Sequence, residues 1–182
     1  MSSREQPIVE RAAMPNPQID VWQGEIAELE VDAIIVPANE SLFMTGRTAG
    51  GLKRRAGAEV ERQAVAQGPV PAGSVVVTSA GELAAAWLLH TVAVGHDLRA
   101  DAKQLSRALE AALARAEELG ARRVAMAPLG VERGVFTAPD AAKLTIDALM
   151  AHPQVDAVIA VASAEDAAAY VAALDAARAG AR

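Results

Sequence analysis

The sequence predicts an α/β domain, a three-layer α/β/α sandwich around a central mixed, mostly parallel sheet. Short apolar runs alternate along the chain with longer segments of helical periodicity, which is the pattern of strand–helix–strand units. Two loops rich in small residues, 39–51 and 130–136, each follow an apolar run, and open α/β sheets bind ligands at such strand ends. The 182 residues are enough for one domain with a good core.

Composition and charge exclude several classes of function. The net charge of −6 argues against an electrostatic surface for duplex nucleic acid or for an anionic membrane. The chain has no cysteine, which excludes disulfides, thiolate metal ligands and a cysteine nucleophile. The N-terminal sequence lacks the apolar core of a signal peptide, and no apolar run is long enough to span a bilayer, so we expect a cytoplasmic protein.

The N-terminal part of the chain begins with a polar, proline-containing segment, residues 1–17, which we expect to be a flexible arm before a domain at 18–182. A strand near a sheet edge is predicted at 19–23, where apolar and polar residues alternate. The run 31–36 is apolar and indicates a strand buried on both faces. A helix with a basic first turn is predicted at 52–66.

The middle of the chain contains two further strands and a long helix. The segment 74–78 is rich in β-branched residues, which favours a strand, and 83–94 contains another. In 102–119, leucines and alanines recur at helical spacing, and Gly120 is a typical residue just past a helix end. The segment therefore predicts an amphipathic helix.

The last third repeats the alternation of strand and helix. Strands are predicted at 123–129 and 155–161 from their apolar runs. A helix is predicted to begin at Thr137, because a threonine cap is followed by a proline in the first turn and an acid three residues after the cap. A final helix is predicted from Ser163 to about residue 178, with a solvated outer face.

The loop after the 31–36 strand is the first candidate site. Asn39 comes just past the strand, and Gly46, Gly50 and Gly51 surround the turn into the next helix. Free N–H groups and a partial positive charge at a helix N-terminus suit phosphate, and glycines let the backbone approach a ligand. Together with the 130–136 loop, this predicts an anion or nucleotide site that clamps a diphosphate from two sides. Alternatively, the glycines only close tight strand–helix turns.

Histidines supply weaker candidates for chemistry. His96 and Asp97 follow a strand end and could form an acid/base pair, but adjacent side chains cannot easily face each other, and Asp97 could instead cap a turn. His90 lies within an apolar strand and is interpreted as a core residue. The three histidines have no metal-site spacing and the chain has no cysteine, so no metal is predicted.

Several short motifs, in their order and spacing, resemble the macrodomain family (ADP-ribose-binding, Appr-1-p processing). The resemblance extends from about residue 19 to the last helix, and no single motif decides it. The motifs are Gly-Glu-Ile at 24–26, Val-Asp-Ala-Ile-Ile-Val-Pro-Ala-Asn at 31–39, the segments 50–57, 73–78, 89–92, 116–120 and 124–128, and Gly-Val-Phe at 134–136.

The resemblance implies a binding site for ADP-ribose. By this resemblance, Glu25 accepts a hydrogen bond from the adenine amino group, and the backbone of Ile26 lies near adenine. Asn39 contacts the distal ribose, and Phe136 packs against it. The two phosphate loops are 45–51 and 132–136. The alternatives are a surface turn for Glu25, a turn cap for Asn39 and a core position for Phe136. The implied ligand-binding residues are Glu25, Ile26, Asn39, Thr45, Gly46, Arg47, Gly50, Gly51, Glu132, Arg133, Gly134, Val135 and Phe136.

The chain departs from the family pattern in three places. Val36 stands where the family has an asparagine, and Phe-Met-Thr-Gly-Arg at 43–47 replaces a run of glycines. Ala49 stands where many ADP-ribosyl hydrolases of the family have an acid that positions a water, and alanine cannot do so. Asn39 is then the best candidate for a catalytic residue.

Three hypotheses stay open at this point. The chain is a binder of ADP-ribose or a derivative; or a hydrolase that releases ADP-ribose from an adduct or deacetylates O-acetyl-ADP-ribose; or a degenerate domain with another nucleotide ligand. Ala49 favours the first, and Phe43 and Met44 favour the third. The expected partner is ADP-ribose or an ADP-ribosylated macromolecule, without a cofactor, duplex nucleic acid or membrane, and the chain is expected to be a monomer or a weak homodimer.

Overall fold

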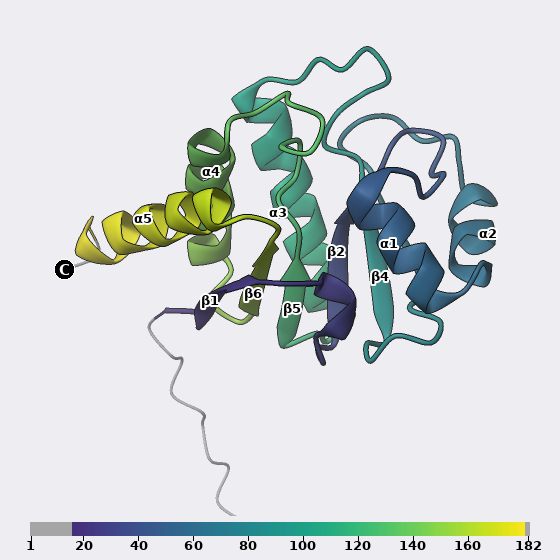
Figure 1. Cartoon of the computed structure of the whole chain (residues 1–182), viewed down its shortest axis with the longest axis horizontal. Coiled ribbons are helices and arrows are strands. Elements are labelled where there is room, and N and C mark those ends of the chain that lie inside the picture. Colours follow the sequence, from purple (N-terminus) through teal and green to yellow (C-terminus); the bar gives the residue numbers. More distant parts are fainter. Residues whose placement is uncertain (1–15, 181–182) are drawn as a thin grey trace, which may run out of the picture.

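A computed structural model describes residues 16–180, so the arm expected at 1–17 lies almost entirely outside the described residues. Six strands form one sheet in the order β1-β6-β5-β2-β4-β3. All neighbouring pairs are parallel except β3 with β4, which is antiparallel. The predicted mixed, mostly parallel sheet is therefore confirmed (Figure 1). The strands are β1 Ile19–Gln23, β2 Ala33–Pro37, β3 Val75–Ser79, β4 Trp87–Thr91, β5 Arg123–Met126 and β6 Asp156–Val161.

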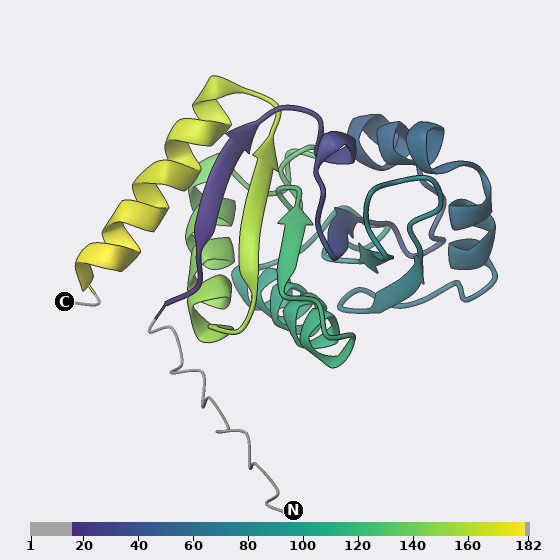
Figure 2. The same cartoon turned by 90° about the horizontal axis from the view of Figure 1, so that it is seen from below.

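Helices cover both faces of the sheet, which confirms the predicted three layers (Figures 1 and 2). Helices α3, α4 and α5 pack on one face, and α1 with the short 3-10 helix η1 packs on the other. Helix α2 packs against β3. No helix within residues 16–180 is both long and apolar enough to cross a membrane. The helices are η1 Ile26–Glu28, α1 Gly46–Ala56, α2 Glu59–Val65, α3 Ala102–Glu118, α4 Ala138–Ala151 and α5 Ala164–Gly180.

Strand β2 shows why its sequence is apolar at every position. Alternate side chains of a strand point to opposite faces of the sheet. Ile34 therefore packs in the cluster that contains α1, and Ile35 packs in the cluster that contains α3. Both side chains are fully buried, because helices lie on both sides. A strand in this position cannot carry a polar face. The prediction of a strand buried on both faces is therefore confirmed, but the strand begins at Ala33 and ends at Pro37 rather than covering 31–36.

The prediction of one helix at 52–66 is wrong about where the helix begins and about its being continuous. Helix α1 already begins at Gly46, and the chain breaks at Gly57, whose φ of 92° lies outside the helical region, before α2 begins at Glu59. The start was missed because small residues precede Leu52 and give no apolar periodicity. The basic residues Lys53 to Arg55 consequently lie in the last turn of α1, where positive charge is favourable to the helix dipole.

His90 is a buried core residue, as its apolar strand predicted. Its side chain is on β4 with only 1% of its surface exposed, and its Nε2 forms a 3.0 Å hydrogen bond with Oγ1 of Thr78 on the antiparallel neighbour β3. Burial lowers the pKa of His90 from 6.5 to about 4, because the charged imidazolium would lose its hydration. The folded protein therefore holds this ring neutral.

This burial predicts that stability falls as the pH is lowered. Between pH 6.5 and about 4 the unfolded chain binds a proton at His90 and the folded chain does not, so stability present above pH 6.5 is lost on acidification. The fall in the pKa of His90 from 6.5 to about 4 corresponds to a loss of about 3 kcal/mol in the free energy of unfolding. We expect His90→Gln to show a shallower decline in the free energy of unfolding between pH 7 and about pH 4, measured by urea denaturation. Parallel curves for the two proteins would contradict the prediction.

Candidate functional site

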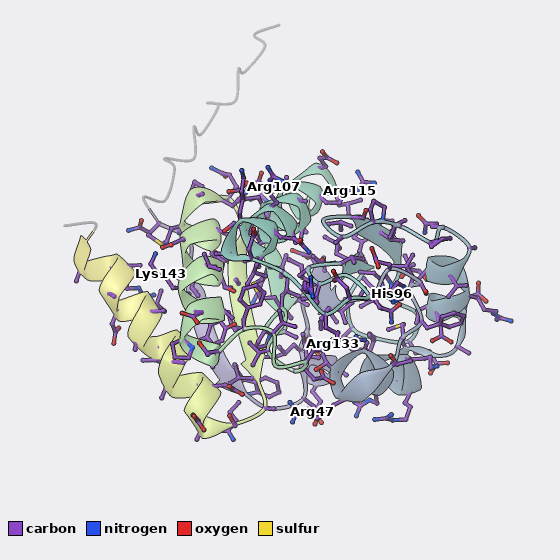
Figure 3. The ribbon with its side chains drawn as sticks, turned by 90° about the horizontal axis from the view of Figure 1, so that it is seen from above. Arg47, His96, Arg107, Arg115, Arg133 and Lys143 are labelled. Atoms are coloured by element: carbon purple, nitrogen blue, oxygen red, sulfur yellow. The ribbon has the colours of Figure 1, made fainter. Side chains whose placement is uncertain are left out.

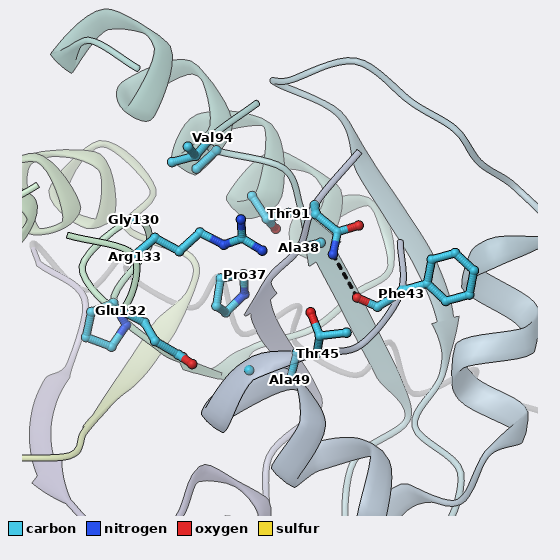
Figure 4. A pocket seen from close by; sticks show the side chains of 14 residues that line it. Pro37, Ala38, Phe43, Thr45, Ala49, Thr91, Val94, Gly130, Glu132 and Arg133 are labelled. Carbon is cyan, nitrogen blue, oxygen red and sulfur yellow. Dashed lines mark hydrogen bonds between the residues drawn. The ribbon is translucent and has the colours of Figure 1, made fainter. Parts of the chain in front are cut away.

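Two cavities open at the end of the sheet where the parallel strands terminate. The first, of about 150 Å³, lies between the loops that follow β2, β4 and β5 (Figure 4). The second, of about 390 Å³, lies between the end of β1, the turn into η1 and helix α1. The first is lined by Pro37, Ala38, Asn39, Phe43, Thr45, Gly46, Ala49, Thr91, Ala93, Val94, Pro128, Gly130, Glu132 and Arg133. The second is lined by Gln23, Gly24, Glu25, Ile26, Ala27, Arg47, Thr48, Leu52 and Ala162.

The register of the sheet brings the three loops of the first cavity together. Pro37 at the end of β2 pairs with Thr91 at the end of β4, so the two strands stop side by side. On its other side β2 pairs with β5, where Ile35 lies opposite Met126. Because these strands are parallel, the backbone leaves the sheet at the same edge after each of them, and the loops that begin there line one opening.

Asn39 lines the first cavity and carries a hydrogen-bond acceptor that has no partner within residues 16–180. Its Nδ2 donates a 2.9 Å hydrogen bond to the carbonyl of Phe43, which holds the side chain in place (dashed line in Figure 4). Its Oδ1 is buried and has no hydrogen-bond partner among the described residues. Buried polar atoms are nearly always paired, so an oxygen left in this state is suited to accept a hydrogen bond from a ligand.

Glu132 stands between the two cavities. Its carboxylate accepts hydrogen bonds from the backbone N–H of Arg47 at 2.5 Å and of Thr48 at 3.3 Å, in the first turn of α1. Partial burial acts to raise the pKa of Glu132, but the Thr48 hydroxyl, these two N–H groups and the Arg47 guanidinium outweigh it and hold the pKa below its usual value. The N-terminus of α1 is therefore an anion site, and the Glu132 carboxylate of the same chain occupies it.

Two arginines supply positive charge around the cavities despite the negative charge of the chain. The guanidinium of Arg133 extends across the first cavity toward Thr91 and Ala38 (Figure 4). Arg47 lines the second cavity from the first turn of α1. Figure 3 shows both residues at the same end of the molecule, Arg133 on the loop between β5 and α4 and Arg47 in the first turn of α1. An anionic group between the cavities would be flanked by both guanidinium groups.

The structure brings together some of the site residues predicted from the sequence. Asn39, Thr45, Gly46, Glu132 and Arg133 line the first cavity, whereas Glu25, Ile26 and Arg47 line the second. The other five lie on neither lining: Gly50, Gly51, Gly134, Val135 and Phe136.

Those five residues have other surroundings in the structure. Gly50 and Gly51 belong to helix α1 rather than to the loop in which they were predicted. The ring of Phe136 lies against Gly130 and packs on the core below it. Val135 packs on the same core. Gly134 has a φ of 69°, in the turn between Gly130 and α4.

Other cavity residues were not named individually as ligand-binding residues, and of these Thr91 and Val94 lie outside both predicted loops. Phe43 is 53% exposed at the rim of the first cavity, and Thr91 and Val94 line it from the end of β4. Thr48 lines the second cavity. The rule that ligands bind at the carboxyl ends of parallel strands would have selected the residues after β4, had the pairing of β4 with β2 been known.

His96 and Asp97 do not form a pair. The His96 ring contacts Ser41, with 3.1 Å between Nε2 and Oγ, and lies 3.8 Å from a carboxylate oxygen of Glu40. Asp97 instead accepts a hydrogen bond from the backbone N–H of Arg99, which is the turn-capping alternative. Within residues 16–180, no three histidine, aspartate or glutamate side chains are grouped closely enough to hold a metal ion.

Gly130 lines the first cavity and leaves room for the ring of Phe136 on its other side. Its φ is 77°, and an added Cβ would lie 2.6 Å from Cδ2 of Phe136. We expect Gly130→Ala to destabilise the fold by about 3 kcal/mol, from backbone strain and overpacking together. Gly134→Ala is the matched control: its φ is 69°, but nothing lies within 4 Å, so strain alone should cost about 1 kcal/mol. If urea denaturation shows that both variants lose the same free energy of unfolding, the Phe136 contact is unimportant.

Comparison with known proteins identifies the family of this chain through one family model. The model of the Macro domain family matches residues 35–145. An uncharacterised protein of Mycobacterium tuberculosis is 32% identical over 135 residues; the match covers 74% of this chain and 38% of that protein, so this chain spans well under half of that relative. Two solved structures share the fold. A macrodomain of Oceanobacillus iheyensis with MES bound has a TM-score of 0.80 at 21% identity, covering 91% of this chain and 94% of that one. A Trypanosoma brucei macrodomain in complex with ADP-ribose has a TM-score of 0.78 at 20% identity, covering 84% and 67%.

Proposed function

Since this chain belongs to the Macro domain family, we propose that it binds ADP-ribose or an ADP-ribose derivative in the cleft formed by its two loops. The observation that carries the proposal is the anion site at the N-terminus of α1, with one cavity on each side of it. A dinucleotide-like ligand has this form, with a diphosphate between two ring systems. The related T. brucei macrodomain was solved with ADP-ribose, which supports the same ligand class here.

The two cavities suggest how the ligand would lie. Adenine would enter the larger cavity, where the Glu25 carboxylate would accept a hydrogen bond from the adenine amino group and the backbone of Ile26 would lie beside the ring. The diphosphate would lie against the first turn of α1, near Arg47 and Arg133. The distal ribose would enter the smaller cavity and donate a hydroxyl hydrogen bond to the unpaired Oδ1 of Asn39. The role assigned to Phe136 stays a prediction, because its ring packs against Gly130.

Ala49 favours binding over hydrolysis. It lies on the wall of the first cavity, so an acid at this position would face a bound ribose. The methyl group of alanine can neither orient a water nor accept a proton. The neutral amide of Asn39 can orient a water but does not act as a base. A hydrolase or O-acetyl-ADP-ribose deacetylase would therefore need a different catalytic group, and we propose a binder.

ADP-ribose binding is tested by calorimetric titration. We expect saturable heat and a raised melting temperature with ADP-ribose, and a loss in affinity of about tenfold in Asn39→Ala, which corresponds to one hydrogen bond of about 1.4 kcal/mol. The chain's other asparagine provides the matched control, because Asn16 is exposed and precedes β1 at the opposite end of the strands. Asn16→Ala should bind as the wild type does. The absence of heat and of a thermal shift at millimolar ADP-ribose would refute the proposal and favour another nucleotide.

A turnover assay separates the binder from the enzyme. ADP-ribosylated protein and O-acetyl-ADP-ribose are incubated with the protein, and free ADP-ribose and acetate are measured over time. Because position 49 is alanine, we expect no release above the rate in buffer. Release that depends on enzyme concentration and falls in Asn39→Ala would contradict this expectation and assign the catalytic role to the asparagine.

A further inference from the structure

We propose that Glu132 is an internal competitor for the ligand: its carboxylate occupies the anion position at the N-terminus of α1, and ADP-ribose enters only when the 130–136 loop releases it. The inference rests on the proposed function, and it adds a regulatory step to the same site. It places this step on a single side chain of the second loop.

The contacts of Glu132 are those expected of a bound anion. Both carboxylate oxygens are used, Oε1 by the N–H of Arg47 and Oε2 by the N–H of Thr48. The preceding residue in α1 is Gly46, and a Cβ there would lie 2.7 Å from Oε1, so the absence of a side chain makes room for the carboxylate. Thr45, the N-cap residue, makes no side-chain cap hydrogen bond, which leaves Glu132 as the cap.

A diphosphate and this carboxylate cannot share the position. Both are anions, and both need the same first-turn N–H groups of α1. The carboxylate also divides the cleft, because Glu132 lines the smaller cavity while Arg47 and Thr48 line the larger one. If Glu132 moves away, the two cavities join into one continuous site long enough for a ligand with a ring system at each end.

The loop that carries Glu132 contains the joints that such a movement needs. Gly130 and Gly134, with φ of 77° and 69°, flank Val131 to Arg133. Glycine changes between such backbone conformations at little cost. Val131 packs on the core, whereas Glu132 and Arg133 are exposed, so the movement that frees α1 is confined to these two residues. Glu132 is held to α1 by hydrogen bonds from Arg47 and Thr48 and by the charge of Arg47, and its exposed side chain lies outside the apolar core clusters.

A purely structural helix cap is the competing interpretation, and inorganic pyrophosphate distinguishes the two. Glu132→Ala loses its cap under either interpretation, so its melting temperature should fall. If the vacated position is an anion site, pyrophosphate should raise the melting temperature of Glu132→Ala by several degrees and that of the wild type by much less. Glu82→Ala removes an exposed acid in the turn between β3 and β4 and should respond as the wild type does. Equal responses in all three proteins, or none in Glu132→Ala, would overturn the proposal.

ADP-ribose titration then tests competition directly. Removal of a charged cap should tighten ADP-ribose binding in Glu132→Ala by about tenfold, and Glu132→Gln, which keeps one acceptor without the charge, should lie between that variant and the wild type. If the wild type and Glu132→Ala bind ADP-ribose equally, the competitor is refuted and the proposed function stands. If pyrophosphate stabilises Glu132→Ala while no variant binds ADP-ribose, the occupied anion site stands and the ADP-ribose proposal fails.

Discussion

Parallel pairing of β2 with β4 on one side and β5 on the other is the constraint on which the cleft depends. It aligns the ends of three strands, so three loops far apart in sequence begin at one edge of the sheet. The same strand carries the two main core clusters on its opposite faces, through Ile34 and Ile35. The candidate site therefore lies at the end of a strand that is buried on both faces, where the backbone is held from both sides.

The core is built almost entirely from aliphatic side chains, because aromatic residues make up only 3% of the chain. Alanines on α3 and α4 allow these helices to approach the sheet closely, and Leu105, Leu109 and Leu113 of α3 are completely buried. Close packing of small and branched residues supplies the stability that larger rings provide in other domains. The exposed ring of Phe43 is unusual in this setting, since it lies at the cavity rim rather than in the core.

The first turn of α1 connects the two loops electrostatically. A helix leaves its first N–H groups without partners inside the helix, and something outside must bind them. Here the partner is a side chain 85 residues away from Arg47 in the sequence. The opposite end of the same helix carries Lys53, Arg54 and Arg55, which suit the partial negative charge there. The polar side chains that line the smaller cavity, which include an amide, a carboxylate and a guanidinium, are suited to recognition.

The sequence by itself determined the class of sheet, the alternation of strands and helices along the chain, and the family, because periodicity and short motifs are local properties. It predicted a site at Asn39 and both loops, and the role of each ligand-binding residue stays a prediction. It could not determine where α1 begins, because small residues carry no periodicity. Only the tertiary structure decided that Glu132 binds α1, that Phe136 packs against Gly130, and that Thr91 and Val94 face the cavity. Each of these contacts joins segments that come together only through the pairing of parallel strands, and that pairing leaves no signal in either segment alone.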